Sequence, residues 1–227
     1  MKITWLGQAG LLFEKDNVKI MVDPYLSDSV VKVNPKNYRR APVDESIFDI
    51  APDIMIVTHD HLDHLDPETL PRFLARGNIK LLAPENAWQK ARAYGGDNNY
   101  IRMSEHCRWS EGRFRFVAVR AEHSDPTALG FVIFDGKRSY YVSGDTLYSD
   151  KVVDSVRHVC PDGVDVAFVP INGVGNNMNM QDAAELCRAI GAKIAVPVHF
   201  GMFDNLDASK FPLDNAVIPE LYKEIKL

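Results

Sequence analysis

The chain has 227 residues, of which 46% are hydrophobic and 25% charged, and its formal net charge is −5 at pH 7. This composition excludes a disordered protein, and the acidic balance disfavours a nucleic-acid partner, because neutralising phosphates supplies most of the affinity for nucleic acids. Three cysteines without a CxxC pair supply neither a disulfide framework nor a thiolate zinc site.

The first third of the chain predicts β-structure. Short apolar or alternating runs are separated by polar turn residues, and Asp23-Pro24 ends the third run because proline cannot continue a central strand. The strands are expected at Ile3 to Leu6, Gly10 to Glu14 and Val18 to Val22. The polar segment from Ser27 to Asp49 predicts a loop or lid.

Strands and helices alternate in the rest of the chain. Strands are expected at Ile54 to Val57, Lys80 to Ala83, Arg113 to Arg120, Ala128 to Asp135, Lys137 to Ser143, Val164 to Ile171 and Ile194 to Val198. Helices are expected at Pro67 to Ala75 with Asp66 as N-cap, Glu85 to Tyr94, Asp150 to Val159, Gln181 to Ile190 and Pro219 to Ile225. Two β-rich halves with helices between them favour antiparallel sheets with helices on their outer faces, in one domain spanning residues 1–227.

Two features bear on location. The chain opens directly into a predicted strand instead of a secretory signal, and no apolar run is long enough to cross a bilayer. We therefore expect a cytoplasmic protein with no membrane partner. Both a monomer and a homo-oligomer are compatible with the sequence.

The segment from His59 to His64, with the sequence HDHLDH, follows an apolar strand and is the most informative in the chain. Residues two apart in an extended segment point the same way, so His59 and His61 can offer ring nitrogens to one metal ion. Once the chain turns, Asp63 and His64 can reach a second ion nearby. The alternative, a solvated polar loop, would crowd titratable groups together without a counter-ion, which is unfavourable.

Three further candidate ligands occur in matching contexts. His123, Asp145 and His199 each come just after an apolar strand, where the edge of a sheet can present side chains to a shared cleft. His106 and His158 lack this setting and are expected to be bystanders.

These motifs, in this order, resemble the metallo-β-lactamase superfamily along nearly the whole chain. The resemblance implies an α+β fold, a four-layer αββα sandwich with its site at one edge of two packed sheets. It implies a first metal ion on His59, His61 and His123, a second on Asp63, His64 and His199, and Asp145 as the bridge between them. Asp23, in Val-Asp-Pro, would orient the ligands, with a plain turn residue as the alternative.

Within the superfamily, the segments Trp5 to Gly10, Val22 to Leu26 and Pro197 to Gly201 are similar to the branch that contains L-ascorbate-6-phosphate lactonase. That likeness implies a metal-dependent hydrolase that uses metal-activated water on a small lactone or phosphorylated metabolite. Asp63 is the candidate for orienting the nucleophile and shuttling its proton. Nitrogen and oxygen ligands suit one or two divalent ions, zinc or manganese, with iron as a further option.

The substrate is expected to be a small molecule, and an anionic one is among the candidates. Arg39 and Arg40 lie in the lid-like segment and could clamp a phosphate, although a solvated basic patch is the alternative. Asn177 and Asn179 are expected to face the substrate, with capping of the following helix as the alternative.

Two other enzyme classes share this fold. A phosphodiesterase or nuclease would keep the same metal ligands, but the acidic balance disfavours RNA. A di-iron oxidoreductase is disfavoured because that branch has a glutamate where this chain has Asp60.

Overall fold

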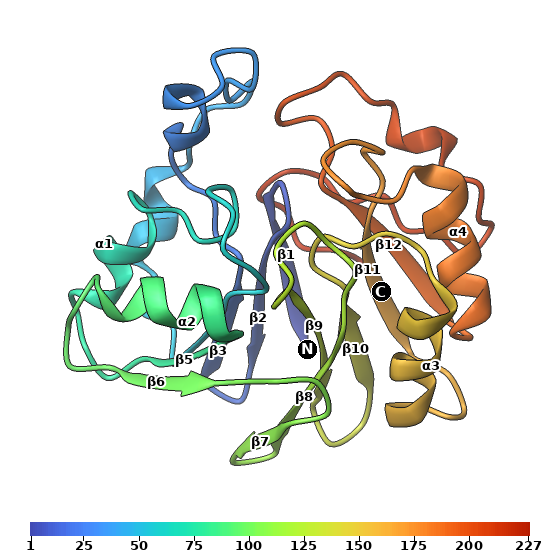
Figure 1. Cartoon of the computed structure of the whole chain (residues 1–227), viewed down its shortest axis with the longest axis horizontal. Helices are drawn as coiled ribbons and strands as arrows, with labels where there is room; N and C mark the ends of the chain where they lie inside the picture. The colour runs from blue at the N-terminus through green and yellow to red at the C-terminus, as the bar shows by residue number, and fades with distance from the viewer.

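Two six-stranded β-sheets pack face to face in the computed structural model, which describes residues 1–227 (Figure 1). The first sheet has the order β1-β2-β3-β4-β5-β6, from β1 (Lys2–Gly7), β2 (Gly10–Lys15), β3 (Val18–Val22), β4 (Ile54–Ile56), β5 (Lys80–Ala83) and β6 (Asn99–Arg102). The second has the order β12-β11-β10-β9-β8-β7, from β7 (Arg108–Glu111), β8 (Phe114–Arg120), β9 (Leu129–Phe134), β10 (Ser139–Val142), β11 (Val166–Pro170) and β12 (Ile194–Val198).

Helices cover the outer faces of both sheets (Figure 1). On the first sheet lie α1 (Leu70–Leu74) and α2 (Glu85–Arg92), and on the second lie α3 (Asp150–Val159) and α4 (Met180–Ala189). Short 3₁₀ turns occur at η1 (Ser29–Lys32), η2 (Glu45–Asp49) and η3 (Ala208–Lys210). The predicted four-layer αββα sandwich is therefore confirmed. None of its helices combines the length and the apolar character that a membrane crossing requires.

Alternating side chains of each strand explain the layers. In β3, Ile20 and Val22 enter the core between the two sheets, whereas Met21 enters the core beneath the helices. In β11, Phe168 faces the central core and Val169 the helices. Because both faces of each sheet are covered, the central strands β4 and β11 are apolar at every position instead of alternating with polar residues.

The sheets are mixed, so the expectation of purely antiparallel sheets is wrong. Strands β3 to β6 run parallel to one another, as do β10 to β12. The remaining neighbours pair antiparallel. The cause is the connecting segments: a helix, or the long segment with η1 and η2 between β3 and β4, returns the chain to the end where the first strand began, which makes the pair parallel.

Three local expectations also need correction. Helix α1 begins at Leu70 with Thr69 as N-cap, because the Asp66 carboxylate binds the backbone N–H of Glu68 and the hydroxyl of Thr69 one turn earlier. The expected helix at residues 219–225 is instead a turn at residues 221–223 followed by a single bridge between Glu224 and Thr4 on the edge of β1, where the backbone N–H of Ile225 donates to the carbonyl of Ile3 at 2.8 Å. Strands β6 and β7 had not been predicted.

Candidate metal centre

Strand direction brings the candidate ligands to one edge of the sandwich. Within the first sheet β1, β3 and β4 run the same way, and within the second β8, β10, β11 and β12 do so. The segments after these strands carry Gln8, Asp23, the residues from His59 to His64, His123, Asp145, Asn172 and His199. Ligands commonly bind where the carboxyl ends of such strands converge.

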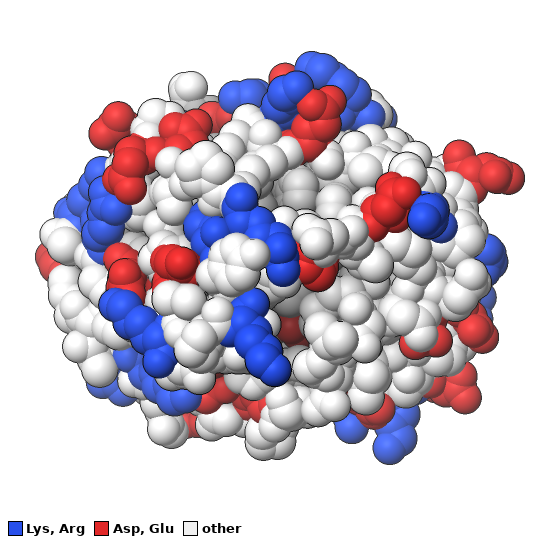
Figure 2. All heavy atoms as spheres, turned by 90° about the horizontal axis from the view of Figure 1, so that it is seen from above, with Lys and Arg blue, Asp and Glu red and all other residues white.

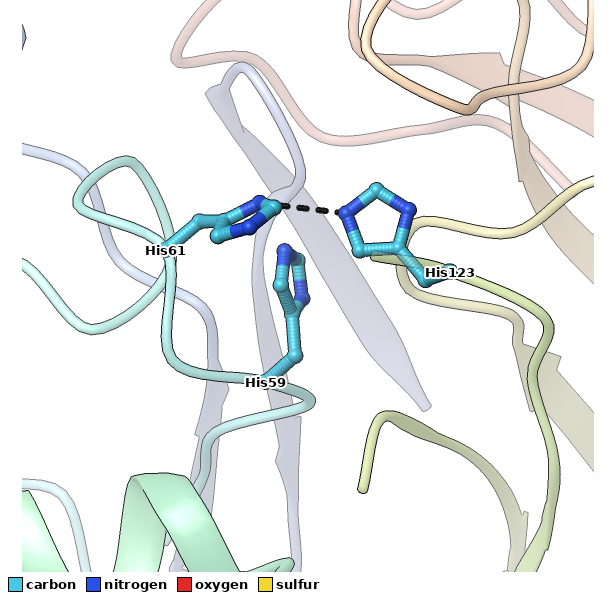
Figure 3. Close-up of side chains that lie close together, drawn as sticks. All are labelled: His59, His61 and His123. Carbon is cyan, nitrogen blue, oxygen red and sulfur yellow. Dashed lines mark hydrogen bonds between the residues drawn. The ribbon is translucent and has the colours of Figure 1, made fainter. Parts of the chain in front are cut away.

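One group of three histidines joins the two sheets. His59 and His61 come from the loop after β4, and His123 comes from the loop after β8; their rings point toward one another (Figure 3). Nδ1 of His61 and Nε2 of His123 lie 3.1 Å apart. One ring nitrogen from each of the three lies within 4.8 Å of the others.

A second group lies beside the first. Asp63, His64 and His199 each place one atom within 4.8 Å of the others, and His199 Nε2 is 3.2 Å from Asp63 Oδ2. Asp145 lies between the groups: its Oδ1 is 3.2 Å from His64 Nε2, and its Oδ2 is 4.0 Å from His123 Nε2. The structure thus brings all seven predicted ligands into one cluster.

Asp23 is fully buried and contacts the cluster through His64 and Thr58. Its Oδ2 is 2.8 Å from Nδ1 of His64, and its Oδ1 accepts a hydrogen bond of 2.8 Å from the backbone N–H of Thr58. The Thr58 hydroxyl donates to the same carboxylate. These contacts orient His64 so that its Nε2 faces Asp145, and they fix the start of the histidine-rich loop.

Gly144, just before Asp145, allows this loop to approach the second sheet. Its φ is +59°, and a Cβ at this position would lie 2.7 Å from Cβ of Thr58. Any side chain here would push the two loops apart, so glycine is required for Asp145 to reach His64.

Gln8 belongs to the centre, although it had not been predicted to do so. It is buried in the turn between β1 and β2, and its Nε2 donates a hydrogen bond of 2.8 Å to Asp63 Oδ2. The same nitrogen lies 3.2 Å from His199 Nε2, and the Gln8 carbonyl accepts from the backbone N–H of His199. Gln8 and His199 both have positive φ, 51° and 59°, a strained conformation for side-chain-bearing residues that often occurs at functional sites.

Electrostatics divides the histidines of the centre into two kinds. Burial lowers the pKa of His59 well below its usual range, and burial also lowers the pKa of His123. Burial opposes the charged forms of His64 and His199 as well, but the Asp145 carboxylate and its acidic neighbours outweigh it and raise both pKa values, that of His199 to about 10. Buried carboxylates here are balanced by protons, a role that a divalent cation can take instead.

The residues present fit a divalent metal ion. Nε2 of His59, Nε2 of His64 and Oδ1 of Asp145 are buried and make no hydrogen bond of good geometry, although the last two atoms lie 3.2 Å apart. Leaving one such atom unpaired costs about 1–3 kcal/mol, so three in one cluster call for a partner that accepts lone pairs from all of them. A cation does so, and the imidazole and carboxylate donors suit zinc, manganese or iron.

The predicted substrate contacts receive uneven support. Arg39 is occupied elsewhere, because it donates to the carbonyls of Tyr25 and Ala41 and to the hydroxyl of Tyr222. Together with Arg40 it lines a hollow separate from the cleft at the metal centre, so the position of the two arginines does not support a phosphate clamp.

The two asparagines also differ. Asn177 lines the cleft and accepts a hydrogen bond from the backbone N–H of Thr146. Asn179 caps α4, accepting from the backbone N–H groups of Gln181 and Asp182, which is the capping alternative.

Comparisons with known proteins agree with this geometry. The family model described as "Beta-lactamase superfamily domain" matches residues 19–200. A UPF0173 protein of Pyrococcus furiosus is 30% identical over 100% of this chain and 97% of its own length. A UPF0173 metal-dependent hydrolase of Staphylococcus aureus is 27% identical over 96% of this chain and 93% of its own.

The chain is also similar to a phospholipase and to a metallo hydrolase of known structure. An N-acyl-phosphatidylethanolamine-hydrolyzing phospholipase D of Caenorhabditis elegans is 26% identical over 88% of this chain and 64% of its own length. The solved structure of a metallo hydrolase from Ignicoccus hospitalis superimposes with a TM-score of 0.78, covering 99% of this chain and 97% of the other at 18% identity. This last likeness concerns the fold alone.

Proposed function

We propose that this chain, which belongs to the metallo-β-lactamase superfamily and within it to the UPF0173 family of metal-dependent hydrolases, hydrolyses small cyclic esters, that is lactones. The protein is a metal-dependent hydrolase.

One observation supports the metal-dependent chemistry, whereas the choice of lactones follows the likeness of the chain to the lactonase branch. Three buried ligand atoms without hydrogen-bond partners, on His59, His64 and Asp145, belong to the cluster that includes His61, His123, Asp63 and His199. His59, His61 and His123 would hold one divalent ion, Asp63, His64 and His199 would hold a second, and Asp145 lies within reach of both groups. A divalent metal held there would polarise a carbonyl group and lower the pKa of water.

The chain's own residues position the reactants. Asp63 is the candidate that orients the attacking water and takes up its proton, since its carboxylate lies at the cleft and is held by Gln8 through a 2.8 Å hydrogen bond. Asp23 fixes the orientation of the His64 ring. Thr58 and His59, at the start of the histidine-rich loop, are buried and exclude solvent from the inner side of the metal centre. In the proposed reaction, water adds to the acyl carbon, the ring C–O bond breaks, and the leaving oxygen takes a proton, giving a hydroxy acid.

A metal analysis followed by a substrate panel tests this function. We expect purified protein to contain zinc, manganese or iron, and to open simple lactones such as γ-butyrolactone. A chelator and the substitution His61→Ala should each abolish the activity, while His158→Ala, on the exposed side of α3, should leave it unchanged. Hydrolysis of bis(p-nitrophenyl) phosphate without any lactone opening would favour the phosphodiesterase alternative instead.

A further inference from the structure

Carboxamide side chains line the cleft that opens onto the metal centre. The cleft has a volume of about 740 Å³, and six of its lining side chains are amides: Gln8, Asn34, Asn37, Asn172, Asn176 and Asn177. They come from the β1–β2 turn, the lid-like segment and the loop after β11. Segments far apart in the sequence thus contribute the same chemical group to one cavity.

No lysine or arginine lines this cleft. Its charged lining side chains, apart from histidine, are Asp63, Asp145 and Asp204. Figure 2 shows Lys and Arg side chains at the top, left and centre of this face, whereas its right part is mainly uncharged apart from acidic and basic groups at the edge. Of the nearby arginines, Arg40 donates to the carbonyl of Phe203 and stacks on Tyr38, outside the cleft.

Asn172 provides a second, independent observation. Its Oδ1 is buried, yet it has no hydrogen-bond partner, and the residue lines the cleft just after β11. A buried amide oxygen without a partner is stabilised by an O–H or N–H donor of a ligand. It forms no hydrogen bond with an ionised phosphate or carboxylate, because these groups present acceptors only.

These observations separate two parts of a bound substrate. Metal ions would attract the reacting group, whatever its charge, but the rest of the molecule meets amides that both donate and accept. A phosphate group remote from the reacting carbon would find no lysine or arginine in the lining of the cleft. Asp204, the one lining carboxylate that is not a candidate metal ligand, would repel it.

We infer that the cleft selects a neutral, hydroxyl-rich lactone over its phosphorylated counterpart, with Asn172 as a specificity-determining residue; this rests on the proposed lactone hydrolysis. The reaction is unchanged: water adds to the acyl carbon, the ring C–O bond breaks, and a polyhydroxy acid leaves.

Paired substrates test the inference. With metal-loaded enzyme, we expect kcat/KM for D-glucono-1,5-lactone to exceed that for its 6-phosphate by about tenfold or more, one hydrogen bond being worth about that factor. Equal or faster turnover of the phosphate ester would overturn the inference.

Substitution of Asn172 adds a readout beyond overall activity. Asn172→Ala should raise KM for gluconolactone about tenfold while leaving kcat, and the turnover of hydroxyl-free γ-butyrolactone, nearly unchanged. Asn99→Ala, on the exposed edge strand β6, is the matched control and should change neither. An equal loss on both lactones would indicate a merely structural role and count against the assignment.

Binding of an inert analogue distinguishes failure of the inference from failure of the proposed function. We expect calorimetry to show that gluconolactam binds the metal-loaded protein more tightly than its 6-phosphate does, and more weakly to Asn172→Ala. If gluconolactam binds more tightly than its 6-phosphate but the protein opens no lactone, the inferred preference for a neutral ligand is correct and the proposed lactone hydrolysis is wrong. If the phosphorylated lactam binds more tightly, the substrate class is wrong.

Discussion

The side chain of Gln8 donates a 2.8 Å hydrogen bond to the carboxylate of Asp63, joining the first turn of the chain to the histidine-rich loop 55 residues later. Gln8 is 1% exposed, so water does not compete for this bond. The amide therefore fixes one carboxylate oxygen and leaves Asp63 a single orientation at the cleft. Gln8 acts through Asp63, which makes it a positioning residue.

Gln8→Ala should lower kcat by about 10- to 100-fold, the usual effect of losing a group that orients a metal ligand. KM should change little because the side chain's main contact is with Asp63. Gln8→Glu, which places a second carboxylate beside Asp63, should be worse than alanine. Steady-state kinetics at saturating metal measures both variants.

Gln89→Ala is the matched control. Gln89 lies on α2 and donates to Glu85 at the surface, so its loss should leave kcat unchanged. Wild-type kcat in Gln8→Ala, with metal bound, would show that Asp63 does not need this contact.

The sequence was enough to identify the cluster around His61 because ligands in this fold come in a recognisable order. It did not identify Gln8, since a glutamine in a strand-end turn carries no metal-ligand signal. Only the strand directions show that β1 ends at the same edge as β3 and β4. The roles of Arg39 and Asn179 were also beyond the sequence: a guanidinium or amide serves backbone groups and ligands equally well, and only the folded positions distinguish them.

The elements with many buried residues were the ones that the sequence predicted correctly. Helix α3 and strand β12 match their expected bounds because each combines an apolar pattern with a clear start and end. Strands β6 and β7 have no fully buried residue, so their sequences lack the apolar run that marks the other strands. The last segment contains helix formers, but it pairs with the open edge of β1, and this tertiary contact overrides local preference.

Asp23→Ala should weaken both the fold and the metal centre. The substitution leaves the backbone N–H of Thr58 buried without its acceptor, at a cost of about 1–3 kcal/mol in the free energy of unfolding. It also releases Nδ1 of His64, which should lower metal affinity about 10- to 100-fold. Urea denaturation and competition with a metal indicator measure the two effects. For Asp49→Ala, at an exposed position, neither quantity should move.

Metal removal should destabilise the protein. Buried ligand atoms without partners gain one only when a cation binds, and a ligand that binds only the folded state at 100 times its Kd adds about 2.7 kcal/mol. For a chain of this size, that corresponds to an increase in Tm of about 5–10 °C. Calorimetric scans with and without zinc or manganese measure the shift. The increase should be smaller in His61→Ala and undiminished in His158→Ala, and equal increases in both variants would place the ion elsewhere.

Asp135 links the two sheets through Lys15, whose Nζ lies 2.6 Å from Asp135 Oδ2. The other carboxylate oxygen of Asp135 accepts hydrogen bonds from the backbone N–H groups of Lys137 and Arg138. Burial alone would raise the pKa of Asp135, but the Lys15 hydrogen bond and the two N–H groups outweigh it and lower that pKa to about 2. A carboxyl whose pKa is lower in the folded than in the unfolded state stabilises the fold above its unfolded pKa, and this contribution disappears as the pH falls through the folded value.

Asp135→Asn should therefore lower the free energy of unfolding by roughly 2 kcal/mol at pH 7. The difference from wild type should shrink between about pH 4 and pH 2, where the wild-type carboxyl itself becomes protonated. Urea midpoints at pH 7, 4 and 2.5 measure this difference, with Asp97→Asn, an exposed position, as the control. A deficit of the same size at pH 2.5 and pH 7 would mean that asparagine disturbs the turn itself, and that the ion pair between the sheets contributes nothing.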